Sequence, residues 1–186
     1  SESTAMECAI NWDFVEKNPH IIGDFVWSAI DYLGESGIRN TDYYDKNEIR
    51  FPQFLDAPWF NAWCGDIDIC GNRKPQSLFR DIVWGNSKIQ MLVHAPVPDE
   101  KTEKTSYWGW PDESASWNWN GHENELMDVR VFTRYPIVRL YLNNRLLDEK
   151  TVINDLKNRY TVSFKVPYQK GMLKAVAVNN GIETDS

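Results

Sequence analysis

Polar and aromatic residues gather at the end of an apolar run near position 30. Residues 21–26 have the apolar content of a buried strand, and the residues that follow its expected end are Trp27, Asp31, Tyr32 and Glu35. A strand that only filled a core would not need this polar and aromatic end. An indole is suited to stacking on flat apolar partners, and the C–H face of a sugar ring is one of them. The question is what Trp27 and Asp31 face, and the structural alternatives are an indole that caps a core and a carboxylate that caps a loop.

A second group of tryptophans lies in the segment 106–123. Aromatic residues make up 13% of the chain, which has nine Trp, and four of these are Trp108, Trp110, Trp117 and Trp119. Trp is costly to bury fully and useful on surfaces that stack against flat partners. The group could form a stacking platform for a glycan, or it could pack two domains against each other. His122, in the same segment, is expected to be a surface or packing residue.

Composition excludes several classes of protein. The net charge of −7 argues against a nucleic-acid partner, because neutralising phosphates needs clustered Lys and Arg. The sequence has no apolar run as long as a membrane span and no Cys/His cluster with zinc spacing. No signal peptide opens the chain. We expect no membrane span, no metal and no cofactor, and a hydrophobic content of 42% is ample for a folded core.

The three cysteines leave at least one thiol unpaired. They are Cys8, Cys64 and Cys70. Cys64 and Cys70 could form a disulfide bond, but we favour buried free thiols.

Strand and helix signals alternate before Gly85. Residues 5–18 carry a helical apolar stripe that Pro19 ends, and residues 34–58 are loop-like. Residues 74–84 read as a second helix, with Pro75 in its first turn and Gly85 past its end. This order is typical of a parallel α/β fold. Residues 1–85 are too few to complete such a fold, so they indicate the end of something larger.

Short alternating strands follow Gly85. We expect them at 88–94, 128–134, 137–147, 160–168 and 171–181, with a tight turn at Asn143–Asn144. Residues 98–106 are charged and are expected to form a mobile loop. This spacing predicts a small antiparallel sandwich over residues 86–186. The side chains expected to point inward are Val138, Leu140, Leu142, Val162, Phe164 and Leu173.

Two pairs of segments resemble glycoside hydrolase family 2, the β-galactosidase and β-glucuronidase family. "GDFVWSAIDYLGESG" and "DICGNRKPQSLFRDIVW" are similar to its last barrel strand and last barrel helix. "VRVFTRYPIVRLYLNNRLLDEK" and "VPYQKGMLKAVA" are similar to the sandwich domain that often follows the barrel. The resemblance implies an α/β barrel remnant, the last βαβα segment, in residues 1–85. It implies an all-β immunoglobulin-like sandwich in residues 86–186.

The resemblance also implies site residues. Glu2 falls on the position of the catalytic nucleophile of a retaining glycosidase, Trp27 on the wall of the cleavage subsite, and Asp31 on the nearby rim. A solvated charge is the structural alternative for Glu2. The general acid/base has no counterpart, because Asn47-Glu48 and Asn124-Glu125 both lie downstream of the strand that ends at Trp27. In this family a W-x-W segment follows the first strand of the sandwich, so packing between domains is the favoured role of the tryptophans in 106–123.

The expected function is therefore part of a β-galactosidase-like enzyme that cleaves terminal β-linked sugars. The substrate would be an oligosaccharide or glycoside, and the other partner would be the rest of the parent enzyme. The family implies a periplasmic or secreted location. We expect the isolated chain to be inactive and to self-associate. The alternative is a non-catalytic sandwich module that binds carbohydrate or supports domain assembly.

Overall fold

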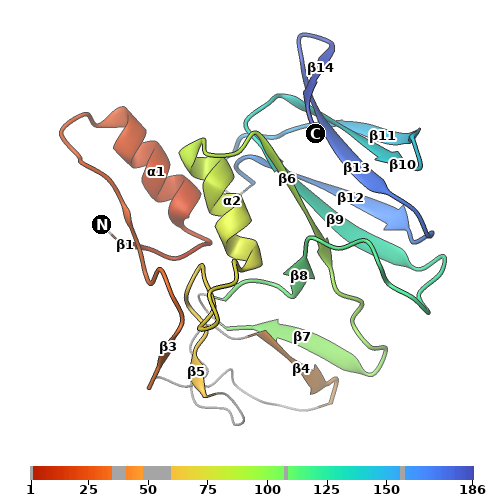
Figure 1. The fold of residues 1–186 in the computed structure, drawn as a ribbon, viewed down its shortest axis with the longest axis horizontal. Coiled ribbons are helices and arrows are strands. Elements are labelled where there is room, and N and C mark those ends of the chain that lie inside the picture. The colour runs from red at the N-terminus through yellow and green to blue at the C-terminus, as the bar shows by residue number, and fades with distance from the viewer. Residues whose placement is uncertain (1, 35–40, 48–59, 107–108, 156–157) are drawn as a thin grey trace. The chain divides into compact units, whose positions relative to one another are not determined.

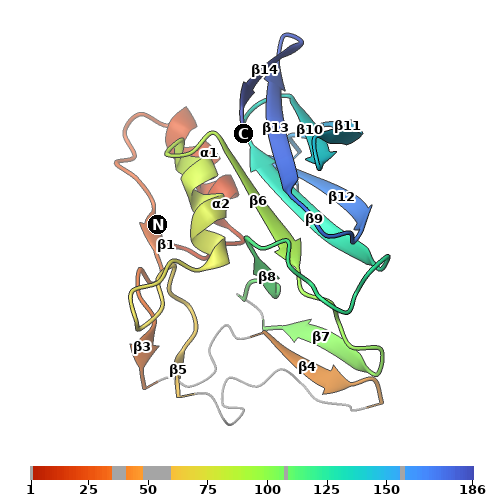
Figure 2. The same cartoon turned by 45° about the vertical axis from the view of Figure 1, so that its right-hand side comes forward.

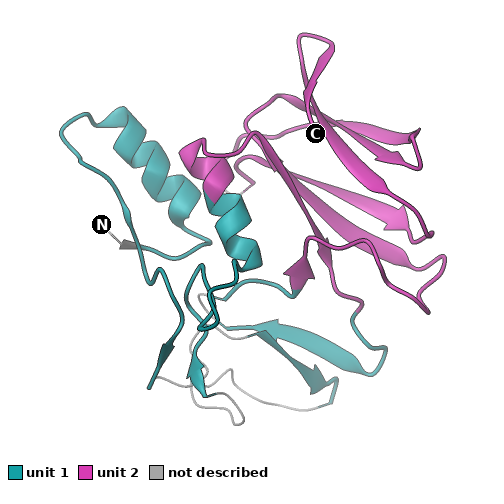
Figure 3. Cartoon of the chain, viewed as in Figure 1, with its two compact units in different colours: residues 1–80, 97–112 teal, residues 81–96, 113–186 magenta. Residues whose placement is uncertain are grey.

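The computed structural model describes residues 2–34, 41–47, 60–106, 109–155 and 158–186. The chain divides into two compact units: unit 1 holds residues 1–80 and 97–112, and unit 2 holds residues 81–96 and 113–186 (Figure 3). The predicted boundary after Gly85 lies close to the first division. The return of residues 97–112 to unit 1 has no counterpart in the predicted two-part organisation.

Unit 2 is an antiparallel β-sandwich of two four-stranded sheets (Figures 1 and 2). One sheet has the order β11-β10-β13-β14 and the other β12-β9-β6-β8. The first sheet consists of β10 (Ile137–Leu142), β11 (Arg145–Thr151), β13 (Leu173–Asn179) and β14 (Ile182–Asp185). The second consists of β6 (Ile89–His94), β8 (Glu113–Ser114), β9 (Leu126–Thr133) and β12 (Thr161–Pro167).

Alternation along the strands places one apolar set between the two sheets. Buried and half-buried residues alternate along all of β10, as a strand with one face in the core requires. All six side chains predicted to point inward belong to the buried core cluster. The β10–β11 hairpin turns at Asn143 and Asn144, whose φ values of 51° and 63° suit a tight turn.

Unit 1 contains a parallel strand–helix–strand segment. Its elements are β1 (Glu2–Ser3), α1 (Cys8–Lys17) and β2 (Phe25–Val26). The two strands pair in parallel, with Glu2 opposite Phe25 and Ser3 opposite Val26. The helix α2 (Pro75–Trp84) runs across the division between the units, and Gly85 follows it with a positive φ of 76°. Both predicted helices are therefore present, and the second ends where its glycine predicts.

Two further strand pairs complete unit 1. Strand β3 (Tyr32–Leu33) pairs with β5 (Asn61–Ala62), and β4 (Thr41–Asp45) pairs with β7 (Lys101–Thr105). Both pairs are antiparallel.

The structure corrects the prediction of a mobile loop at 98–106 and of a loop at 34–58. Part of the first forms β7, and part of the second forms β4. The charges of β4 and β7 are complementary where the two strands pair. Asp42 lies opposite Lys104, and Lys101 Nζ forms an ion pair of 2.7 Å with Asp45 Oδ1. Opposite charges that face each other across two strands stabilise the pairing. Neither segment alone shows that the other carries complementary charges, so local sequence patterns do not predict this strand pair.

The prediction of a buried strand over residues 21–26 is also wrong. Only Phe25 and Val26 are in a strand, and Ile22 and Phe25 are 97% and 64% exposed. Among the described residues β2 pairs only with β1, so this two-stranded sheet leaves both side chains in solvent.

The three cysteines are free thiols, with Cys8 and Cys64 buried. Cys70 is exposed, which departs from the predicted burial. Within the described ranges, no helix is both long enough and apolar enough to cross a membrane.

The alternation in the β10–β11 hairpin can be tested by truncating one leucine on each strand. Leu140→Ala should lower the free energy of unfolding of the 186-residue chain by about 2–5 kcal/mol, because Leu140 is fully buried and its removal leaves a cavity. Leu147→Ala, on the exposed face of β11, should change it by less than about 0.5 kcal/mol. Urea unfolding followed by circular dichroism measures both. Equal losses in the two variants would contradict the sandwich core described above.

Candidate functional site

The predicted site residues lie along β1, β2 and the segment that follows β2. Glu2 is in β1, and its side chain is outside the described part of the structure. Trp27 comes directly after β2, donates its backbone N–H to Ser3 O at 3.2 Å, and leaves its side chain 45% exposed. The peptide bond between Trp27 and Ser28 is cis. The structure therefore brings the backbones of β1 and Trp27 together, as a shared site would require.

Asp31 lies in a buried network and not at an open rim. The side chain is paired with the ammonium of Lys74, whose Nζ lies 2.9 and 3.2 Å from the two carboxylate oxygens. The backbone N–H of Gly65 donates to Asp31 Oδ1 at 2.6 Å. Lys74 Nζ also donates to Trp63 O at 2.8 Å. Each charge is thus matched by an opposite charge and a backbone partner, as buried charges require.

The network holds three separate segments of unit 1 together. Asp31 lies in the segment after β2, and Gly65 lies in the segment after β5. Lys74 is the residue that directly precedes α2. The backbone adds further bonds, from Asp31 N to Ile67 O at 2.9 Å and from Ile67 N to Ala29 O at 3.0 Å. These bonds fix the path of the chain immediately after Trp27.

Gly65 is at the closest backbone approach in this network. A Cβ atom there would lie 2.2 Å from Asp31 N and 2.6 Å from Ile67 O, both of them backbone atoms. The Gly65 carbonyl accepts a hydrogen bond of 2.7 Å from Gln76 Nε2, on the first turn of α2. Only glycine fits this position without moving the chain.

Burial governs the protonation of the ion pair. Burial raises the pKa of the Asp31 carboxyl, and the Lys74 ammonium and the Gly65 N–H offset part of that rise. Burial likewise lowers the pKa of the Lys74 ammonium, and Asp31 opposes that change. In each case the partner's opposite charge offsets part of the effect of burial on the pKa.

A second buried ion pair joins α2 to the segment after β5, and its arginine also bonds to β1. Arg80 Nε lies 2.5 Å from Asp66 Oδ2, and Arg80 Nη1 donates to Ser3 Oγ at 3.3 Å. Burial raises the pKa of the nearby Cys8 thiol to about 12, so this cysteine is not a thiolate nucleophile at neutral pH.

Sequence reasoning missed most of these groups. Asp31 is a site residue predicted from the sequence, whereas Lys74, Gly65, Asp66 and Arg80 are not. Their partners are far away along the chain, and no local spacing signals them. Three residues named from the sequence, Glu35, Glu48 and Trp108, lie outside the described residues. Glu125 is exposed and pairs with His122 at 2.8 Å, in keeping with the surface or packing role expected for His122.

The tryptophans of the 106–123 segment divide between the two units. In unit 1, Trp110 is buried, with its ring centroid 5.6 Å from that of Phe79. In unit 2, Trp117 and Trp119 pack against the sandwich core. The Trp117 indole donates to Gln169 O at 2.9 Å and meets Tyr168 edge-on at 5.1 Å. These described tryptophans serve the packing of the unit in which each lies.

Comparisons with known proteins agree along almost the whole chain. Residues 124–185 match the family model described as "Domain of unknown function (DUF4982)". Two solved structures of glycosyl hydrolase family 2 members from Bacteroides cellulosilyticus are 34% and 33% identical and cover 98% of this chain, with TM-scores of 0.79 and 0.72. A protein of Formosa agariphila named "Putative beta-glucuronidase" is 25% identical over 91% of the chain. The chain spans only 23% and 21% of the two structures and 13% of the Formosa protein.

The buried ion pair predicts a pH-dependent loss of stability when one partner is removed. Lys74→Met should lower the free energy of unfolding at pH 7 by about 3–5 kcal/mol, because it leaves Asp31 buried without its cation. The folded-state pKa of Asp31, already raised above 3.8, should then rise further. A raised carboxyl pKa favours the folded state at low pH, and this stability is lost as the pH rises through that pKa. The deficit relative to wild type should therefore shrink as the pH falls from 7 toward 4.

Urea unfolding at several pH values measures this effect. The matched control is Lys165→Met, which breaks the exposed ion pair between Lys165 and Asp128 and should change stability little at any pH. Asp31→Asn combined with Lys74→Met should recover part of the loss. A Lys74→Met deficit that is independent of pH would show that lost packing, and not the uncompensated carboxylate, is the cause.

Proposed function

The chain belongs to glycoside hydrolase family 2, and from that premise we propose that it supplies the end of the catalytic barrel and the following sandwich of a retaining glycosidase. The single observation that carries the proposal is the parallel pairing of β1 with β2, which places Glu2 opposite Phe25 and next to the Trp27 segment. The proposed substrate class is a glycoside with a terminal β-linked sugar.

The strand–helix–strand segment supports the barrel assignment. Parallel strands joined by a helix are the repeating unit of a (β/α)8 barrel, whose active site lies at the carboxyl ends of its strands. Glu2 lies on β1 and Trp27 directly follows the neighbouring parallel strand β2, and the Trp27 N–H bonds to Ser3 O at 3.2 Å. This arrangement suits a nucleophile and a sugar-binding wall at one rim.

In the proposed reaction the Glu2 carboxylate attacks the anomeric carbon of the substrate. The glycosidic C–O bond breaks, a carboxylic acid protonates the leaving oxygen, and a covalent glycosyl-enzyme forms. Water activated by the same second carboxyl group then releases the sugar, with the two carboxyl groups about 5 Å apart. The acid/base would come from a part of the parent protein outside this chain, and Trp27 would line the sugar subsite.

Exposed apolar side chains on unit 1 support the presence of further barrel elements in the parent protein. Helix α1 exposes Ile10 and Phe14, four residues apart on one helix face, and Ile22 and Phe25 are exposed near β2. A face of this kind on a soluble domain marks a contact surface. The rest of the barrel would cover it, and in its absence the isolated chain should self-associate.

The identity of the sugar that the enzyme cleaves is part of the proposal. The segments that resemble family 2 suggest a β-galactosidase-like enzyme, whereas the Formosa relative is named for β-glucuronide cleavage. A galactoside and a glucuronide differ in the configuration at C4 and in the substituent on C5, which is hydroxymethyl in the first and carboxylate in the second, so assays on both substrates distinguish the two activities. A periplasmic or secreted location belongs to the same proposal.

The nucleophile can be tested in the full-length parent protein. Glu2→Gln should lower kcat on its nitrophenyl β-glycoside substrate on the order of 10⁴-fold or more, because the amide cannot form the glycosyl-enzyme. The matched control is Glu125→Gln, an exposed glutamate of the sandwich, which should leave kcat unchanged. Retention of activity in Glu2→Gln would assign the nucleophile to another carboxylate.

The isolated 186-residue chain should hydrolyse neither nitrophenyl β-galactoside nor nitrophenyl β-glucuronide. Proton transfer by a positioned acid contributes roughly 10²–10⁴-fold, and this chain supplies no acid in the expected order. Turnover that copurifies with the chain and disappears in Glu2→Gln would contradict this prediction. A second carboxylate of the chain would then act as the acid.

The alternative function, a carbohydrate-binding sandwich, has its own test. Because the indole of Trp117 already bonds to Gln169 and packs on Tyr168, we expect unit 2 to bind no glycan through it. Glycan-array binding by the chain that is lost in Trp117→Ala, with the sandwich still folded, would favour the binding module instead.

A further inference from the structure

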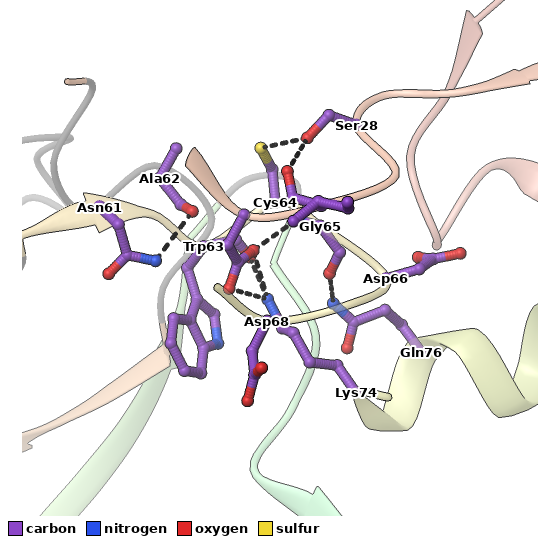
Figure 4. A network of polar contacts seen from close by, with 12 residues as sticks. Ser28, Asn61, Ala62, Trp63, Cys64, Gly65, Asp66, Asp68, Lys74 and Gln76 are labelled. Carbon is purple, nitrogen blue, oxygen red and sulfur yellow. Dashed lines mark hydrogen bonds and ion pairs between the residues drawn. The ribbon is translucent and has the colours of Figure 1, made fainter. Parts of the chain in front are cut away.

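Trp63 is an exposed tryptophan held by a buried cation. Its side chain is 36% exposed, although it follows the buried residues Asn61 and Ala62 of β5. The ammonium of Lys74 lies 4.2 Å from the centroid of the Trp63 ring and also donates to the Trp63 carbonyl at 2.8 Å. One cation thus fixes both the backbone and the indole of this residue (Figure 4).

The orientation of Lys74 is itself determined by Asp31. Lys74 is 5% exposed, and its ammonium has three oxygen acceptors, two of them on Asp31 and the third on Trp63. A buried, fully paired lysine has one favoured position, unlike a lysine on the surface. A charge over an aromatic face is also more strongly attracted when it is desolvated. The indole of Trp63 is therefore held more firmly than an exposed tryptophan elsewhere on the chain would be.

The same contacts place Trp63 beside the Trp27 segment. The next residues along the chain, Ser28 and Cys64, touch through their side chains, with Ser28 Oγ 3.5 Å from Cys64 Sγ. Ile30 forms a parallel bridge with Ile67, and Tyr32 pairs with Ala62. The segment after Trp27 therefore lies beside residues on both sides of Trp63, and each of the two segments carries a tryptophan that is at least one-third exposed.

We propose that Trp63 is a second sugar-contacting residue beside Trp27 and that Lys74 is the positioning residue that orients its indole. The inference rests on the proposed function, because the ligand is the glycoside of that same site. The indole of Trp63 would contact the C–H face of a pyranose ring or of its neighbouring group. Lys74 would touch no substrate and would act through Trp63 and Asp31.

The test uses the full-length enzyme proposed above and the nitrophenyl β-glycoside that the wild type hydrolyses. Trp63→Ala should raise KM about tenfold, the effect of a contact worth about 1.4 kcal/mol, with a smaller change in kcat. Trp63→Phe keeps a flat aromatic face and should restore part of the affinity. Lys74→Met should raise KM in the same direction, and the double variant should be no worse than Trp63→Ala.

Thermal unfolding of each variant separates positioning from stability. Lys165→Met is the control for lysine removal and should leave KM unchanged, since its ion pair with Asp128 lies in the sandwich. An unchanged KM in Trp63→Ala would overturn the inference, whatever happens to the melting temperature. Additive effects of Trp63→Ala and Lys74→Met on KM would overturn the positioning role of Lys74. A wild-type enzyme without turnover on any glycoside would overturn the proposed function itself, and the inference with it.

Discussion

The buried ion pair between Asp31 and Lys74 is the constraint on which the site in unit 1 depends. Removing two charges from water is costly, and the mutual attraction offsets this cost only when the remaining hydrogen-bonding groups are also satisfied. Gly65 N–H and Trp63 O satisfy them here, at 2.6 and 2.8 Å. The pair therefore requires three chain segments to meet at one place, and a glycine where two backbones come closest.

The two units are stabilised by different kinds of interaction. The sandwich of unit 2 has an apolar core between two sheets, which is non-directional and tolerates exchange of one apolar side chain for another. The described part of unit 1 has short strands, exposed apolar side chains near β2, and two buried ion pairs made by Lys74 and Arg80. Directional polar contacts hold its loops where apolar packing between them is sparse.

The sequence predicts the sandwich well and the site poorly, for one physical reason. The alternation at Val138, Leu140 and Leu142 repeats within one strand, so a local pattern contains the whole signal. The partner of Asp31 is 43 residues away, and β4 and β7 pair across an even longer gap. Charge complementarity over such distances becomes visible only after folding. Ile22 and Phe25 mislead for the opposite reason, because their apolar character predicts burial and both side chains are exposed.

The functional role proposed for the ion pair rests on its geometry more than on its contribution to stability. A pair of apolar side chains of similar volume could replace Asp31 and Lys74 with little loss of stability, as buried ion pairs in other folds allow. Such a replacement would not bond to the Trp63 carbonyl or place a cation 4.2 Å from its ring. A binding rim must hold its side chains within a fraction of an ångström of the productive geometry. In the proposed site, directional bonds from a buried cation would meet that requirement for Trp63, whereas non-directional packing would leave the indole free to change rotamer.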